Sequence, residues 1–162
     1  MSEIHQQIEA LYDFALDNPT NEYRVVDIMP IEISLSEHIF LETGVDLRGF
    51  WFSIDNYSIV HTLLRHGNPA KESKHGQIAV VKADFIRLPE ILTSPDSIRL
   101  DFRTYANSII KESLIFYKSY EHHYVVAKEI RRELKKGKVN RLILQTMFIR
   151  KNAETRSASL EK

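Results

Sequence analysis

Apolar residues recur at helical spacing in the first third of the chain. A helix is predicted over residues 3–17, ended by Asn18-Pro19, from the positions of Ile4, Ile8, Leu11, Tyr12, Ala15 and Leu16. A short strand at 23–28 and a helix over 34–44 follow; Ser34 or Ser36 is the expected cap and Gly44 the expected end. The extended segment FWFSIDN then leads into a helix over 55–66, with Ser53 or Asp55 as its cap.

The middle of the chain is less regular. Residues 68–77, NPAKESKHGQ, are polar and contain Pro and Gly, which predicts a loop. The segment KADFIRLPEIL is expected to form a short helix that Pro89 interrupts. Together with the earlier segments, this predicts a helical N-terminal part that carries little strand.

After residue 96 the pattern changes to segments rich in Ile, Val, Tyr and Phe. Four strands are predicted, at 97–103, 108–120, 121–131 and 139–150, with a hairpin turn at 134–138 and a flexible tail at 152–162. Short links between them favour an antiparallel meander. The fold class is therefore α+β, with N-terminal helices packed on a four-stranded antiparallel sheet.

Composition narrows the class of protein further. A chain of 162 residues suits one domain, and the absence of cysteine excludes disulfides and thiolate metal sites. No segment approaches the length of a membrane span, and the polar, acidic start does not resemble a signal peptide. We expect a cytoplasmic protein without a membrane partner. Residues 1–29 are read as an acidic helical segment in front of the main domain at 30–151.

Charge is distributed unevenly, although the formal net charge is +0. Residues 1–60 contain eleven acidic residues against two arginines, and residues 61–162 contain eleven acidic residues against twenty lysines and arginines. This asymmetry predicts an anionic partner for the basic part, and nucleic acid is the commonest one. The alternative is that the two parts of the chain pair with each other.

The helix over 55–66 carries two histidines near a helix end. His61 and Arg65 are one turn apart and share a face, whereas His66 lies on another flank, so the two imidazoles do not project together. Their simplest interpretations are a surface histidine and a histidine favoured at a helix C-terminus by the helix dipole. Adding His75 gives three histidines, but their spacing matches no standard zinc site. We expect no metal and no cofactor.

Basic residues gather again around the predicted hairpin turn. Lys135, Lys136 and Lys138 lie in it and Arg141 follows it, a charge that could hold a phosphate backbone or simply keep the turn soluble. Thr146 would be a lone polar residue between Leu144 and Phe148 if the last strand is regular. A threonine among apolar residues is usually just a good strand former, but its hydroxyl is able to donate to a phosphoryl oxygen.

No phosphate-binding glycine loop and no GxSxG motif is present. The catalytic chemistry that remains is acid–base catalysis by histidine, with lysine and arginine nearby to hold phosphate. Cleavage of RNA through its own 2′-hydroxyl needs only these groups, because histidine titrates near neutral pH and Lys, Arg or Thr can stabilise charge on phosphorus.

Four stretches together resemble a known family: GFWFSIDNYSIVHTLLRHG, HGQIAVVKADFIRLPEIL, YVVAKEIR and LILQTMF. The chain is similar over residues 30–151 to phage-type members of the barnase–EndoU–colicin–RelE-like nuclease superfamily. The resemblance implies a metal-independent endoribonuclease, with helices on a four-stranded antiparallel sheet. Related domains often act as toxins on RNA, including tRNA, and such a toxin would need an immunity or antitoxin protein.

The resemblance also implies roles for individual residues. His61 and His66 would form the acid–base pair, and Arg131 and Thr146 would contact phosphate. Other expected substrate contacts are Arg65, Lys118, Glu129, Lys135, Lys136 and Lys138. The competing hypotheses are a module of the same fold that binds RNA or a protein without cutting, and a structural protein of a phage or mobile element.

Overall fold

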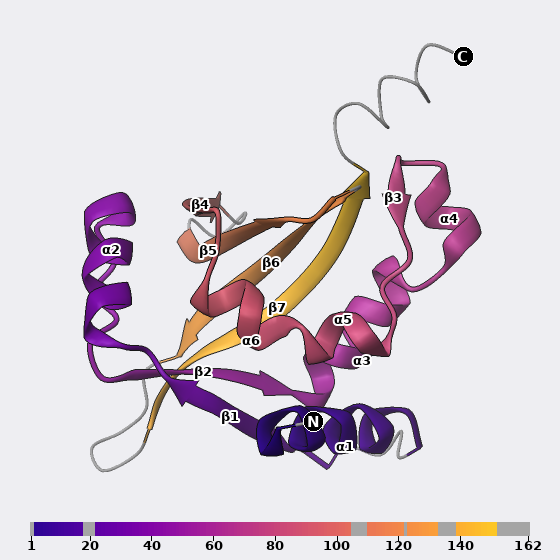
Figure 1. Cartoon of the computed structure of the whole chain (residues 1–162), viewed down its shortest axis with the longest axis horizontal. Helices are drawn as coiled ribbons and strands as arrows, with labels where there is room; N and C mark the ends of the chain where they lie inside the picture. Colours follow the sequence, from indigo (N-terminus) through magenta and orange to yellow (C-terminus); the bar gives the residue numbers. More distant parts are fainter. Residues whose placement is uncertain (1, 18–21, 105–109, 122, 133–138, 152–162) are drawn as a thin grey trace.

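A mixed β-sheet forms the centre of the molecule (Figure 1). The computed structural model describes residues 2–17, 22–104, 110–121, 123–132 and 139–151. Within them, seven strands belong to the sheet: β1 (Val25–Pro30), β2 (Phe50–Asp55), β3 (Gln77–Ile78), β4 (Ser97–Thr104), β5 (Ile110–Ser119), β6 (His123–Arg132) and β7 (Asn140–Lys151). The strand order is β1-β2-β7-β6-β5-β4, and β3 pairs with the far end of β7.

The last four strands form the predicted antiparallel meander, and the α+β class is confirmed. The expectation of a purely antiparallel sheet is wrong, because β2 runs parallel to β7, from the pair Phe50–Asn140 to the pair Ser53–Ile143. β1 then pairs with β2 and extends the sheet further. β2 and β7 are far apart in sequence, so no local sequence pattern could have predicted that they pair. The predicted turn at 134–138 and the tail at 152–162 lie outside the described residues.

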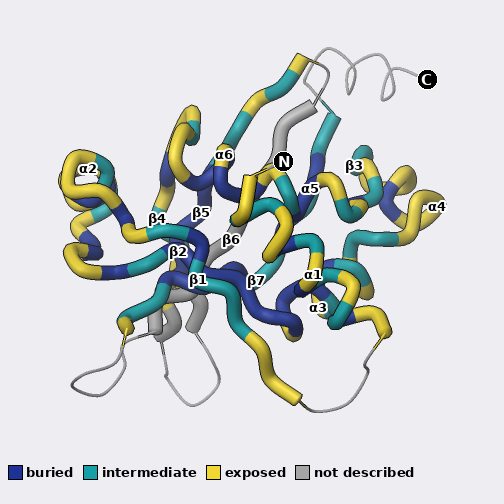
Figure 2. The backbone as a smooth tube through the Cα atoms, turned by 60° about the horizontal axis from the view of Figure 1, so that its bottom comes forward, coloured by how far each residue is buried: buried dark blue, intermediate teal, exposed yellow. Residues whose placement is uncertain are grey.

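Six helices surround the sheet in the described part of the chain: α1 (Glu3–Asp17), α2 (Ile33–Thr43), α3 (Asn56–His66), α4 (Pro69–Ser73), α5 (Lys82–Ile86) and α6 (Leu88–Thr93). Figure 1 shows α5 and α6 lying across the same side of the sheet. The core lies between these helices and the sheet, where Phe52 meets Phe116 edge to face at 5.9 Å. Figure 2 shows β2 buried at the centre and the outer sides of α2 and α4 exposed.

Three local predictions need correction. Helix α2 begins after Glu32 without a side-chain cap, so neither Ser34 nor Ser36 caps it, although Gly44 ends it in the left-handed conformation with φ 77°. The predicted interruption of the helix is present, but it lies at Arg87 between α5 and α6, and Pro89 occupies the first turn of α6, where its missing N–H is not needed. The polar segment 68–77 is not only a loop, since it contains α4 and the start of β3.

Helix α1 and strand β1, from the N-terminal segment, are part of the same core and sheet. Ile8, Leu11 and Ala15 of α1 are buried, and β1 is hydrogen-bonded to β2. The acidic side of α1 remains outside, where Asp13 forms an ion pair of 2.8 Å with Lys82 of α5. Among the described residues, no helix has the length and apolar character needed to cross a bilayer.

Candidate active site

The start of α3 is fixed by its neighbours. Asp55 caps the helix by accepting the backbone N–H of Ser58 at 2.7 Å, which confirms one of the two expected caps. Asn56 is held from both sides: its amide nitrogen donates to the carbonyl of Glu22, and its amide oxygen accepts the N–H of Arg24 at 2.8 Å. These contacts fix the rotation of α3, and so the direction of each histidine on it.

The end of α3 depends on Gly67. Its N–H donates to the carbonyl of Leu63 at 2.9 Å, and a Cβ atom built on Gly67 would lie 2.5 Å from that carbonyl oxygen. Only glycine fits such a close approach. The chain then turns back, and the carbonyl of His66 accepts the N–H of Val80 at 2.8 Å. His66 is thereby held at the last position of the helix.

The imidazole of His66 is paired with a buried carboxylate. Its Nδ1 lies 3.1 Å from Oε2 of Glu72, whose side chain is 2% exposed, while His66 itself is 20% exposed. The ring also packs against Phe148 of β7, with 5.5 Å between the ring centroids. A carboxylate at Nδ1 fixes the ring orientation and favours the tautomer with the proton on Nδ1. Nε2 is then available to exchange a proton.

Helix α4 brings Glu72 to this position. Asn68 caps α4 by accepting the N–H groups of Ala70 and Lys71, and Pro69 occupies the first turn. One turn later Glu72 points back towards α3. A buried carboxylate is costly unless it is paired, so the contact with His66 must compensate this burial.

The last strand carries a row of polar and aromatic side chains next to α3. In the β6–β7 register Lys128 pairs with Thr146 and Glu129 with Leu144, so Gln145 is an extra, bulged residue. Leu142, Leu144, Met147 and Ile149 belong to the core. The opposite side of β7 therefore carries Thr146, Phe148 and Arg150. The expectation that Leu144 shares the face of Thr146 is wrong, because it assumed a regular strand.

Two polar atoms in this row are buried without a hydrogen-bond partner among the described residues: Oγ1 of Thr146 and Nε of Arg150. Phe148, which contacts His66, lies between them, and the guanidinium of Arg150 is 5.4 Å from its ring. Buried unpaired donors are rare in native proteins, and a catalytic role is one explanation for them. Both are able to donate to a phosphoryl oxygen after a small side-chain rotation.

His61 borders a pocket of about 260 Å³ between the start of α3 and the bulge of β7. The other lining residues are Asp55, Tyr57, Ser58, Ile143, Leu144 and Gln145. Partial burial lowers the pKa of His61 below its usual 6.5, and the nearby positive charges of Arg65 and His66 lower it further. His61 is therefore mostly neutral at pH 7, which suits a general base.

The remaining predicted residues are placed as follows. Arg65 is exposed on α3 near His61. Lys118 of β5 donates to the carbonyl of Ser94 at the end of α6, at 2.7 Å, which gives it a structural contact there. The backbones of Glu129 and Arg131 pair with Leu144 and Leu142 on β7. Lys135, Lys136 and Lys138 lie outside the described residues.

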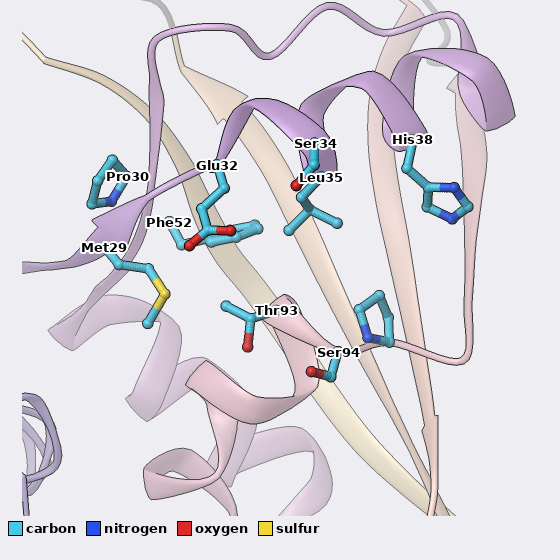
Figure 3. A pocket seen from close by; sticks show the side chains of 10 residues that line it. Met29, Pro30, Glu32, Ser34, Leu35, His38, Phe52, Thr93 and Ser94 are labelled. Carbon is cyan, nitrogen blue, oxygen red and sulfur yellow. The ribbon is translucent and has the colours of Figure 1, made fainter.

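Other hollows of the surface lack this combination. A pocket of about 370 Å³ lies between α2 and the end of α6, with Glu32, His38, Thr93 and Ser94 around it (Figure 3). Its described lining contains an acidic residue and no lysine or arginine, so it offers little to a phosphate. Within the described residues, no group of three or more His, Asp or Glu side chains is arranged to hold a metal ion.

Sequence reasoning missed Glu72 and Arg150. Glu72 was hidden in a segment read as a polar loop, although Asn68-Pro69 is a helix-start signal that would have placed it on a short helix. Arg150 lies at the end of a predicted strand, four residues beyond Thr146 and on its face. The alternation of a strand would have shown this relationship.

Comparison with known protein families gives a match that covers most of the chain. Residues 32–157 match a family described as phage-Barnase-EndoU-ColicinE5/D-RelE like nuclease3. Comparison with curated proteins and with solved structures found no match. The family match covers most of the chain, including α3, α4 and β7 with the histidines and their partners. The chain therefore belongs to the third phage-Barnase-EndoU-ColicinE5/D-RelE like nuclease family.

Proposed function

We propose that this nuclease-family protein is a metal-independent endoribonuclease that uses His61 and His66 for acid–base catalysis. The base removes the proton of a 2′-hydroxyl, and that oxygen attacks the adjacent phosphorus. The acid gives a proton to the 5′-oxygen as its bond to phosphorus breaks. The products are a 2′,3′-cyclic phosphate on one fragment and a 5′-hydroxyl on the other.

The roles of the two histidines follow from their surroundings. His61, with its lowered pKa, is the base. His66 is the acid, because the Glu72 carboxylate at its Nδ1 compensates the positive charge of the protonated ring. Five residues separate them, or about 7.5 Å along the helix axis and about 140° around it, so a substrate that meets both rings has to wrap around the end of α3. Base and acid then act on opposite sides of the phosphorus.

The observation that carries the proposal is the contact between His66 and Glu72. A histidine that only ends a helix does not need a buried carboxylate beside it. An apolar residue in place of the carboxylate would stabilise the fold at least as well. The pairing is understandable as a device that orients an imidazole for proton transfer. It stands beside two buried unpaired donors, Thr146 and Arg150, which suit the charge that develops on phosphorus.

The family resemblance supplies the choice of tRNA as substrate, the contacts of Glu129 and Arg131 with RNA, and a toxin role with a protein inhibitor. The contacts of Lys135, Lys136 and Lys138 with RNA follow from the basic charge around the predicted hairpin turn. The amine of Lys118 donates to the carbonyl of Ser94 at the end of α6, so a contact with RNA would replace that hydrogen bond. A location in the cytoplasm of a host or target cell completes the proposal.

The test is incubation of the purified chain with total tRNA in EDTA, followed by a denaturing gel. Wild type should give discrete fragments with 2′,3′-cyclic phosphate ends, and His66→Ala should give none while remaining folded. His75→Ala is the matched control. Because His75 is exposed and lies beyond α4, this variant should cleave RNA like the wild type. Activity that disappears in EDTA and returns with a divalent cation would contradict the metal-independent mechanism.

A binding module of the same fold predicts a different result. RNA would stay intact with every variant, and a native gel would show a complex that weakens steeply as salt is raised. Intact RNA without any complex would instead favour a structural protein.

A further inference from the structure

The pocket beside His61 has a lining unsuited to a phosphate. Its charged or titratable lining groups are Asp55, Tyr57 and His61, and none of them is a lysine or arginine. Burial and nearby positive charge lower the pKa of His61, which favours its neutral form. Asp55 is held as a carboxylate acceptor by the N–H of Ser58 at 2.7 Å and by the hydroxyl of Tyr23 at 3.2 Å. A negative group near the pocket repels an anion. The pocket therefore favours a neutral group, while the arginine that attracts phosphate, Arg65, lies further along α3.

One wall of the pocket is aromatic. Tyr57 lines it and is 47% exposed, and its ring lies 5.4 Å from that of Tyr23, tilted by 46°. This pair stands at the start of α3, which the cap of Asp55 and the contacts of Asn56 hold in place. A rigid, half-exposed ring is a stacking surface for a flat ring.

The opposite wall carries an amide. Gln145 is the bulged residue of β7 and has no partner in the β6 register. Bulges commonly redirect a side chain next to an active site. An amide offers both a donor and an acceptor, the combination that reads the edge of a nucleobase. Ile143 adds an apolar surface below it.

We propose that this pocket binds one nucleobase of the RNA, stacked on Tyr57 with its edge against Gln145. The proposal rests on the function proposed above, and it goes further by naming a specificity site. Because His61 borders the pocket, the bound base belongs to a nucleotide that adjoins the scissile phosphate. Gln145 then determines which base is preferred at that position, and Tyr57 supplies affinity for any base.

The probes are the four 3′-nucleoside monophosphates, with ribose 5-phosphate and inorganic phosphate as ligands that lack a base. Binding is followed by NMR on the full chain, which separates it from cleavage. Nucleotides should bind at least about tenfold more tightly than ribose 5-phosphate, since stacking on an aromatic ring contributes about that factor or more. They should also shift the signals of Tyr57 and His61.

Three variants of the pocket and one control variant test the proposal. Tyr57→Leu should remove the advantage of nucleotides over ribose 5-phosphate, whereas Tyr57→Phe keeps the ring and should retain it. Phe102→Leu is the control, because Phe102 is a similarly exposed aromatic residue, at 57%, on the distant strand β4. Gln145→Glu removes the amide donor and should change the order of preference among the four nucleotides.

The outcomes separate this proposal from the nuclease mechanism. Equal binding of ribose 5-phosphate and nucleotides, or full nucleotide affinity in Tyr57→Leu, would overturn the nucleobase pocket whatever the cleavage assay shows. Undiminished RNA cleavage by His66→Ala would overturn the acid–base mechanism and leave the nucleotide titrations valid. A protein that keeps nucleotide preference without cutting would be a binding module with this same pocket.

Discussion

Asp27 on β1 and Arg141 on β7 form two hydrogen bonds across 114 positions of sequence, at 2.6 Å from Nε to Oδ1 and 2.9 Å from Nη2 to Oδ2. Ser53, on the strand between them, donates to the same Oδ1 at 2.6 Å. The sequence places Arg141 just after a basic hairpin turn that would either hold a phosphate backbone or keep the turn soluble. In the structure it joins three strands of the sheet that carries the proposed site.

This pair should make stability sensitive to acid. The hydrogen bond from Arg141 lowers the pKa of Asp27 against the opposing effect of burial, and the bond from Ser53 adds to the lowering. The pKa of Asp27 is lower in the folded protein than in the unfolded chain. The stability that the ion pair contributes is therefore fully present above the unfolded pKa, and it is lost as the pH falls through the folded pKa. Asp27→Asn should reduce the free energy of unfolding by about 1–2 kcal/mol at pH 7, and by less at pH 3.

Urea denaturation at the two pH values measures this difference. Asp46→Asn is the control: Asp46 also pairs with an arginine, Arg48, but both are exposed and only two residues apart. That pair can form in the unfolded chain as well, so its loss should leave the unfolding free energy unchanged. If Asp27→Asn lowers the unfolding free energy as much at pH 3 as at pH 7, the proposed link between the charge of Asp27 and stability is wrong.

The pH dependence of cleavage should report His61. If His61 is the base, kcat/KM rises with pH as the imidazole loses its proton, with a midpoint below the ordinary 6.5. Arg65→Gln removes one of the positive charges that lower this pKa, so the rising limb should move to higher pH. The shift will be partial, because burial is the larger cause. A limb that stays in place would argue against His61 as the base.

Thr146→Val should separate stability from activity. The hydroxyl of Thr146 is buried without a partner in the described structure, so replacing it by a methyl group of the same shape should leave Tm unchanged or raise it slightly. RNA cleavage should nevertheless fall, because a donor to the phosphoryl oxygen is lost. Thr146→Ser, which keeps the hydroxyl, should retain more activity than the valine variant. Equal activity of the two would show that the hydroxyl takes no part.

Glu72→Gln should impair cleavage in a protein that still folds. The amide has the size of the carboxylate but no charge, so His66 loses the group that compensates its protonation. We expect at least a tenfold loss of kcat. Nitrogen NMR of the His66 ring should show a changed tautomer population, which a purely structural role for Glu72 would not require. Glu42→Gln, at an exposed position of α2, provides the control.

Gly67→Ala should disturb the end of α3. The added methyl group would lie 2.5 Å from the carbonyl oxygen of Leu63, so the backbone has to move, at a cost of about 1–3 kcal/mol in unfolding free energy. His66, the preceding residue, would move with it, and cleavage should fall even where the protein is fully folded. Leu64→Ala, at an exposed position of the same helix, should change the unfolding free energy little. A stable, active Gly67→Ala variant would contradict this close packing.

The sequence predicted α3 well because its boundaries are local: Asp55 caps it, an apolar stripe defines its buried side and Gly67 ends it. The antiparallel meander was equally accessible, since its strands follow one another along the chain. The parallel pairing of β2 with β7 and the contact of His66 with Glu72 were not. The first joins distant segments, and the second depends on a short helix hidden in a polar stretch.

The central strand of the sheet is the last one to be synthesised. β7 pairs with β6, β2 and β3, and without it the β1–β2 pair is separated from the meander of β4 to β6. Thr146, Phe148 and Arg150 all lie on it. A ribosome-bound chain that ends before residue 140 therefore has no groove beside α3 in which to hold RNA. The order of the strands delays assembly of the proposed site until translation has passed β7, so the nascent chain lacks that site while the ribosome is still making the earlier strands.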